Sequence, residues 1–323
     1  MGWIIKFEFH LHISRSDGRK VVGDKPENDE QTQKLFAASA RLLIERLKSS
    51  LSISTITNYK TALRSFLLYL KNDIDISNVD SDLIRGYERW LRERNVCLNS
   101  ISCYMRSLRS LLTKLGHPDP SPIFNGVYTG KMKTEKRAIG ESELARIKQM
   151  TVKPGSFLSL VRDIFLFSFY ALGMPFIDVA FLRKSQLKDN KLTYFRHKTG
   201  QPITICLEPC MLDIIQRYQT ADSIYVFPLI RSEIKEVAQK EYLSLLSQYN
   251  HALKQLAAKA GIKHLSSYTV RHTWASLAFG NNVELPIISK ALGHTNTQTT
   301  LTYIKGIDDS RLDEANRMII SRI

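Results

Sequence analysis

The residue types best suited to chemistry gather in the second half of the chain. Arg271 and His272 stand side by side in "YTVRHTWAS", and His294 follows a glycine in "ALGHTNTQTTLTY". Tyr303 comes nine positions after His294, and Lys198 lies upstream in "HKTGQP". An arginine fork can hold two phosphate oxygens at once and neutralise a pentacoordinate transition state. Together these residue types can act on a phosphodiester without a metal ion.

The other side chains suit further steps of the same chemistry. His294 can donate a proton to a phosphate oxygen or move one at neutral pH. Lys198, at the expected tip of a hairpin, could protonate a leaving alkoxide. Tyr303 could be the nucleophile, although a phenol with a pKa of ~10 needs cationic neighbours to ionise during the attack.

Each of these residues also has an ordinary structural explanation. Arg271 could form a buried salt bridge, and His294 could cap a helix. Tyr303 could belong to a hydrophobic core, and Lys198 could be a solvated lysine on a tight turn. The order of the residues along the chain, more than any one of them, favours the chemical interpretation.

The surrounding pattern predicts a chain that is mainly α with a small β-hairpin or sheet component, in two domains. In the second, residues 138–323, "LSLVRDIFLFSFYAL" is apolar nearly all round, as in a buried helix. Two strand-like runs in "KLTYFRHKTGQPITICL" are joined by a turn, which predicts a hairpin. A tail helix capped by Ser310 is amphipathic enough to pack on this chain or on a neighbour.

The first domain is expected to be a compact helical unit over residues 34–118. Apolar residues at helical spacing, such as Tyr59, Leu63 and Phe66, mark its helices. The proline-containing tract that follows has a basic end, and it predicts a linker over residues 119–137.

An arm is expected before the helical unit. Phe7, Phe9, Leu11 and Ile13 alternate with polar residues, and Asp17-Gly18 supplies a turn. Residues 1–33 are therefore predicted to form a short N-terminal β-hairpin with a polar linker.

Composition favours a polyanionic partner. The 46 Lys and Arg against 31 Asp and Glu give the 323-residue chain a net charge of +15, and such a surplus suits binding to phosphates. We find no apolar run of about 18 residues, so no membrane span is expected. The N-terminus does not resemble a signal peptide, and the four cysteines lack metal-type spacing. These features are typical of a cytoplasmic protein with reduced thiols.

The ordered set of Lys198, Arg271, His294 and Tyr303 resembles that of the tyrosine recombinases, the phage integrase family. The resemblance covers roughly Lys34 to Ile323. It is carried by "RHTWASLAFGNNVELPIISKALGHTNTQTTLTY" and, more weakly, by "YFRHKTGQP". The segments "SYTVRH" and "GMPFIDVAFL" are similar to the branch found on mobile elements of anaerobic gut bacteria.

The resemblance implies a site-specific recombinase. Tyr303 would attack the scissile phosphate to form a 3′-phosphotyrosine, and Lys198 would protonate the departing 5′-oxygen. Arg271 and His294 would hold the non-bridging oxygens. Neither a cofactor nor a metal would be needed.

The resemblance also implies the partners. The helical domain and the catalytic domain would clamp double-stranded DNA at inverted-repeat sites, and a protein that is monomeric when free would form a homotetramer on DNA. Strand exchange would pass through a Holliday junction and would integrate, excise or invert a DNA segment. DNA-bending proteins could act as accessories. The protein would work in the cytoplasm, at the nucleoid. Arg64, Arg106 and Arg109 of the helical domain are candidate phosphate contacts.

The chain departs from the family pattern in two places. Tyr268 stands where a His or Lys is usual, three residues before Arg271, and its hydroxyl can still donate. In "FYALGMPFIDVAFL" the first family arginine would fall at Pro175, and Leu172 occupies the slot before Gly-Met where the related branch often has an arginine. We consider Arg162 as a substitute, although it could equally form an ion pair on a helix surface.

The missing arginine leaves a second function open. The chain could be a catalytically weakened or non-enzymatic DNA-binding relative that acts as a regulator. A nicking-closing topoisomerase would use the same chemistry, but the separate helical domain and the tail after Tyr303 favour ordered assembly on DNA.

Overall fold

A computed structural model describes residues 35–117, 119–132, 137–296 and 298–301, together with Arg317, Ile320 and Ser321. The chain divides into two compact units, Met1–Lys133 and Thr134–Ile323. The hairpin predicted for residues 1–33 and the tail helix predicted from Ser310 lie outside the described residues.

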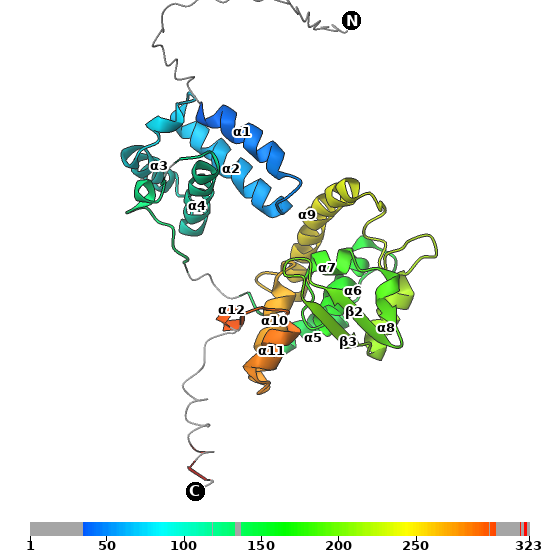
Figure 1. Ribbon diagram of the computed structural model, residues 1–323. Helices are drawn as coiled ribbons and strands as arrows, with labels where there is room; N and C mark the ends of the chain where they lie inside the picture. The colour runs from blue at the N-terminus through cyan, green and yellow to red at the C-terminus, as the bar shows by residue number, and fades with distance from the viewer. Residues whose placement is uncertain are drawn as a thin grey trace, which may run out of the picture. The chain divides into compact units, whose positions relative to one another are not determined.

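The first unit is a helical bundle, drawn in blue to cyan-green in Figure 1. Ser52 and Asp80 cap two of its helices by accepting hydrogen bonds from Thr55 N and Leu83 N. Phe36, Phe66 and Tyr87 are fully buried in its core. Its elements are α1 (Phe36–Leu47), α2 (Ile53–Leu70), η1 (Ile76–Asn78), α3 (Ser81–Glu93), α4 (Leu98–Lys114) and η2 (Pro122–Phe124).

The described part of the segment predicted as a linker, up to residue 132, packs on this unit. Ile123, Phe124 and Val127 join its hydrophobic core. The backbone N–H of Tyr128 donates to the buried carboxylate of Glu88 over 3.2 Å. The first unit therefore extends beyond residue 118, because apolar residues between the prolines find a place in its core.

The second unit builds a small antiparallel sheet among helices. The strands lie in the order β1-β2-β3, and the hairpin prediction is confirmed by β2–β3 pairing from Lys191↔Cys206 to Phe195↔Pro202. Its elements are α5 (Glu141–Gln149), α6 (Phe157–Tyr170), α7 (Phe176–Ala180), η3 (Lys184–Gln186), β1 (Leu187–Lys188), β2 (Lys191–Phe195), β3 (Pro202–Cys206), α8 (Pro209–Tyr218), α9 (Lys235–Ala260), α10 (Thr269–Gly280), α11 (Leu285–Ala291) and α12 (Gln298–Leu301).

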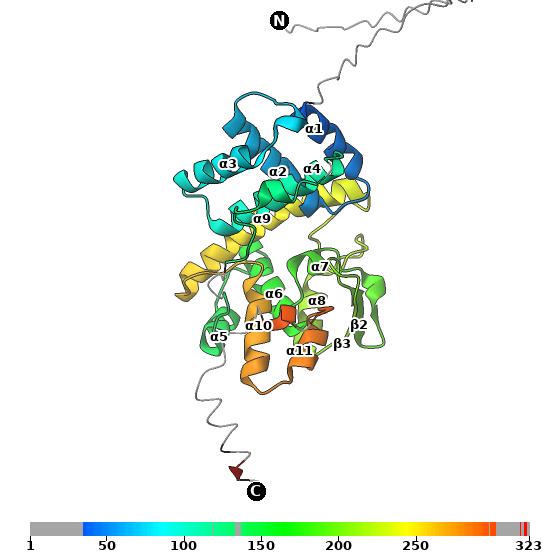
Figure 2. The ribbon, with the colours of Figure 1, turned by 60° about the vertical axis from the view of Figure 1, so that its left-hand side comes forward.

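The prediction of a buried helix is confirmed by α6, which lies in the middle of the second unit and packs against α8, α9 and α10. Figure 2 shows α10 and α11 side by side, with α12 beside them. Across the residues that the structure describes, no helix is both long and apolar enough to cross a membrane.

A sharp reversal after α6 brings the chain back against α10. Leu172 and Gly173 both have positive φ, 59° and 68°, and the Ser168 hydroxyl donates to the Met174 carbonyl. A Cβ on Gly173 would lie 3.0 Å from Arg271 Cα and 3.2 Å from Trp274 Cβ. The reversal therefore sets the distance between α10 and the α6–α7 turn.

We expect Gly173→Ala to destabilise the protein more than Gly155→Ala does. Both glycines have positive φ, but a Cβ on Gly155 would meet nothing within 4 Å. The left-handed backbone costs roughly 1–2 kcal/mol for a residue with a Cβ, and only Gly173→Ala adds the contact with α10. Urea unfolding of both variants measures the difference, and equal midpoints would show that the close approach has no cost.

Candidate active site

Arg271 lies at the centre of the site. It is in the first turn of α10 and only 2% exposed. Its Nη1 donates to the Gly173 carbonyl over 3.3 Å, and its Nη2 donates to the Leu292 carbonyl. Nη2 also lies 3.1 Å from His294 Nε2. The guanidinium thus ties α10 to the turn after α6 and to the end of α11.

His294 follows α11 through a glycine-dependent turn. Gly293 has a φ of 63°, and the His294 N–H bonds to the Ser289 carbonyl, which closes the helix end. The side chain faces elsewhere: Nδ1 lies 2.9 Å from the Thr300 hydroxyl, and Nε2 faces Arg271. Arginine can only donate, so Nε2 accepts and Nδ1 carries the proton.

The surroundings of His294 keep it neutral. Burial, followed by the positive charges of Arg271, Arg196 and Lys198, lowers the pKa of His294 to about 4. A neutral imidazole whose Nε2 carries no proton can accept one in a reaction at neutral pH. The negative charge of a bound phosphate would offset the charges of these three cations and raise the pKa of His294.

This neutral histidine predicts a pH effect on stability. The unfolded-state pKa is near 6.5 and the folded-state pKa is about 4, so the unfolded chain binds more protons between these values. We expect the free energy of unfolding to decrease as the pH falls from about 6.5 towards 4, and to decrease less in His294→Gln. Urea midpoints at pH 7 and pH 5 measure this, with His251→Gln, at an exposed position of α9, as the control. Identical pH profiles for all three proteins would contradict it.

The β2–β3 hairpin brings Lys198 to the same place. The Thr199 hydroxyl donates to the Gly293 carbonyl over 3.1 Å, which fastens the hairpin loop beside His294. Lys198 is exposed, yet close enough for its charge to lower the pKa of His294. The structure therefore gathers Lys198, Arg271 and His294, which are far apart in the sequence.

Arg196 is a further cation of the site and is not among the residues predicted from the sequence. Its side chain is 7% exposed, and Nη1 lies 2.9 Å from Asp178 Oδ2 on α7. Asp178 Oδ1 accepts the His197 N–H over 2.8 Å. Burial raises the pKa of Asp178, against the opposing effects of Arg196, the His197 N–H and Arg271. The alternation of the strand could have identified Arg196, because every second residue lies on the same face. Leu192 and Tyr194 are buried, and Arg196 continues their face.

Arg162 does not join this cluster. Its Nε and Nη2 contact the neighbouring Asp163, and its Nη1 donates to the Met150 carbonyl over 2.7 Å. Asp163 also accepts from Arg217 and Tyr218. Arg162 precedes the end of α6 by eight residues, or roughly 12 Å of helix. We therefore correct the expectation that Arg162 replaces the missing arginine.

Two further predicted site residues of this unit are Tyr268, which lies at its surface, and Tyr303. Tyr268 is the N-cap residue of α10 and is 47% exposed, with its ring 6.5 Å from that of His272. Tyr303 lies outside the described residues. Thr300, three positions earlier, is buried and contacts His294.

In the first unit, Arg64 lies on α2 and Arg106 and Arg109 lie one turn apart on α4. Arg64 and Arg106 are exposed, and Arg109 is half-buried. Arg106 Nε also contacts the Ser102 carbonyl over 3.2 Å. Their contact with DNA stays a prediction.

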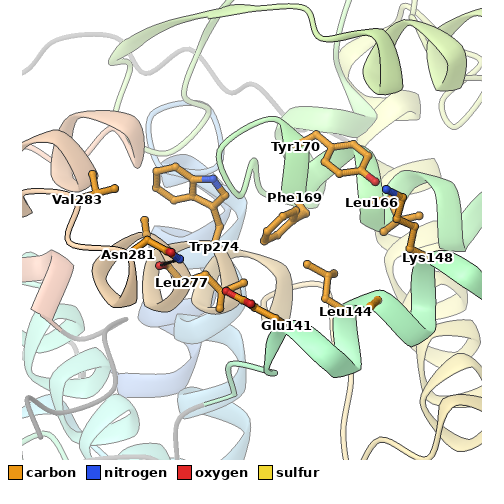
Figure 3. A pocket seen from close by; sticks show the side chains of 12 residues that line it. Glu141, Leu144, Lys148, Leu166, Phe169, Tyr170, Trp274, Leu277, Asn281 and Val283 are labelled. Atoms are coloured by element: carbon orange, nitrogen blue, oxygen red, sulfur yellow. Dashed lines mark hydrogen bonds between the residues drawn. The ribbon is translucent and has the colours of Figure 1, made fainter.

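An apolar pocket of about 560 Å³ lies between α5, α6 and α10, where Phe169 and Trp274 face the same hollow (Figure 3). Leu144, Leu277 and Val283 add to its lining. Arg271, His294 and Lys198 do not line it, so it is distinct from the cationic cluster.

Comparisons with protein families match both units. Residues 35–114 match the model of the phage integrase SAM-like domain, and residues 143–308 match that of the phage integrase family. A tyrosine recombinase of Pseudothermotoga lettingae is 25% identical over 287 residues, which cover 83% of this chain and 93% of that protein. The tyrosine recombinase XerD of Rickettsia bellii is 24% identical, over 81% of this chain and 90% of its own length.

Solved structures share the fold. The Tn1549 transposon integrase in complex with a circular intermediate DNA aligns with a TM-score of 0.63 at 14% identity, over 87% of this chain and 99% of that one. A lambda integrase tetramer bound to a Holliday junction aligns with a TM-score of 0.63 at 13% identity, over 86% and 80%. The mainly helical two-domain architecture is therefore that of the tyrosine integrases.

Proposed function

Because the chain belongs to the phage integrase family, we propose that it is a site-specific recombinase that breaks and rejoins DNA through a 3′-phosphotyrosine. The observation that carries this proposal is the buried Arg271 guanidinium, held beside a neutral His294 and the exposed Lys198. Arg271, Arg196 and Lys198 all place positive charge around His294, and both arginines also act on the Asp178 carboxylate. Such an arrangement suits a phosphate that gains charge in its transition state.

In the proposed reaction, the Tyr303 oxygen attacks the scissile phosphorus. Its proton passes to the unprotonated Nε2 of His294, and the resulting imidazolium donates to a non-bridging oxygen. Arg271 holds the non-bridging oxygens through its fork. The bond to the 5′-oxygen breaks, and Lys198 supplies the proton that this oxygen takes up. Attack by a 5′-hydroxyl on the phosphotyrosine reverses each step.

The proposed assembly follows solved structures of similar integrases, among them a lambda integrase tetramer bound to a Holliday junction. The helical first unit and the catalytic second unit would hold double-stranded DNA between them. Four copies would exchange strands at inverted repeats, to integrate, excise or invert a segment, with DNA-bending proteins as accessories.

The test is to trap the covalent intermediate. A pool of random-sequence duplexes, each with a nick near its centre, lets the short 5′-hydroxyl fragment diffuse away after cleavage. We expect the wild-type protein to retain some of these duplexes through denaturation, and protease to release them. The alternative function, a DNA-binding regulator, predicts duplexes that bind in a gel shift but leave no adduct.

A further inference from the structure

The turn that should carry a second phosphate-binding arginine cannot do so. Pro175, the residue at that place in the family pattern, is the N-cap residue of α7, and its carbonyl accepts the Asp178 and Val179 N–H groups. It has no polar side chain. We propose that Arg196, directly after β2, is a catalytic residue that takes over this phosphate contact, an inference that rests on the proposed recombinase chemistry.

Two nitrogen atoms of the buried Arg196 guanidinium, Nε and Nη1, make no hydrogen bond to the residues that the structure describes. Nη1 lies at ion-pair distance from Asp178, 2.9 Å, but its N–H directions do not make a hydrogen bond. Buried polar groups are almost always hydrogen-bonded, so donors left in this state point to a bound anion that completes them.

The position of Arg196 matches that role. Its stem passes along Gly293, where an added Cβ would lie 2.8 Å from Arg196 Cγ. Its charge acts together with that of Arg271 to lower the pKa of His294. Both arginines also act on Asp178 and on the buried Tyr194. Both arginine side chains therefore lie close to the His294 turn.

Asp178 holds Arg196 in the position from which it would replace the family arginine. It lies on α7, directly after the turn that lacks the arginine, and it binds both the Arg196 side chain and the His197 backbone. The element that would have carried the family arginine instead carries the carboxylate that orients a replacement from the hairpin. Its single negative charge leaves the group of Arg196, Arg271 and Lys198 with a net positive charge for the phosphate.

The test compares Arg196→Ala with wild type on one nicked duplex, chosen from those that the wild-type protein traps. We expect the rate of adduct formation to fall about 10²–10³-fold. A second duplex carries a methylphosphonate at the scissile position, where a methyl group replaces one non-bridging oxygen and removes its negative charge. On this duplex we expect the deficit of Arg196→Ala in adduct rate to shrink by about tenfold or more. The methylphosphonate carries less negative charge in its transition state, so the loss of a guanidinium that stabilises this charge matters less.

Controls separate chemistry from folding. Arg217→Ala removes another arginine that is paired with a buried aspartate, and we expect its adduct rate to stay near that of wild type on both duplexes. If Arg196→Ala does not fold, Arg196→Lys keeps the charge without the fork, and its deficit should shrink on the methylphosphonate in the same way.

Two outcomes would overturn the inference. A rate for Arg196→Ala within about threefold of wild type, where a lost electrostatic donor costs ~10² or more, would show that the phosphate does not need it. An equal loss of adduct rate on both duplexes would show that Arg196 has only a structural role, through its ion pair with Asp178. Failure of the proposed function is a different result, since the wild-type protein itself would then form no adduct, and Arg196 would have no catalytic role.

Discussion

Tyr303→Phe is expected to abolish the covalent protein–DNA adduct and to leave DNA binding unchanged. The substitution removes only the phenolic oxygen, and that oxygen forms the bond to phosphorus in the proposed reaction. No neighbouring cation can replace a missing nucleophile, so the loss should be complete rather than partial. Denaturing gels with a nicked duplex measure the adduct, and a native gel shift with the same duplex measures binding.

The contrary outcomes have different meanings. An adduct that persists in Tyr303→Phe would show that another side chain is the nucleophile. A loss of both the adduct and the gel shift would assign Tyr303 to the structure or to DNA contact. Tyr268→Phe makes the same chemical change at the exposed N-cap of α10, and we expect it to reduce the adduct rate without abolishing it.

Much of the fold could be predicted because hydrophobic period is a local property of the sequence. The apolar run of α6 and the alternation of β2 each have a regular spacing. The segment after Gly116 was harder, since its prolines suggest a linker while Ile123 and Phe124 pack in the core of the first unit. Whether a short irregular segment packs against a domain depends on the surface of that domain. The sequence of the segment itself does not show what that surface is.

The site was predicted in part, and its two misses have physical causes. Arg162 is near the missing arginine in sequence, but a straight helix carries it roughly 12 Å from the end of α6 and Asp163 engages it there. Arg196 is far from Pro175 in sequence, yet the hairpin returns it to the site. A charged residue next to a turn is usually solvated. The informative feature was that Arg196, directly after β2, continues the buried face of Leu192 and Tyr194.

The partners of Arg271 could not be predicted from residue types. Its guanidinium binds the backbone carbonyls of Gly173 and Leu292, and every residue has a carbonyl. What places them is the positive-φ reversal after α6 and the end of α11. The arginine was recognisable from its motif, but its orientation depends on two turns from other parts of the chain.

These contacts lead to the second large effect, which is expected for Arg271. We expect Arg271→Ala to lower the rate of adduct formation by about 10³-fold or more, because it removes a phosphate donor worth ~10²–10³ and also the partner of His294 Nε2. It also leaves two buried carbonyls without their donor, at about 1–3 kcal/mol each. The variant should therefore be less stable as well as less active.

Arg271→Lys separates these two losses. A lysine keeps the charge but has no fork, so it cannot reach Gly173, Leu292 and His294 together. If the fork matters for the phosphate, Arg271→Lys should stay close to Arg271→Ala in adduct rate while recovering part of the urea midpoint. Recovery of the adduct rate to near the wild-type value would show instead that a point charge is enough. In that case the carbonyl contacts of Arg271 serve the fold, and the geometry of its guanidinium does not contribute to the chemistry.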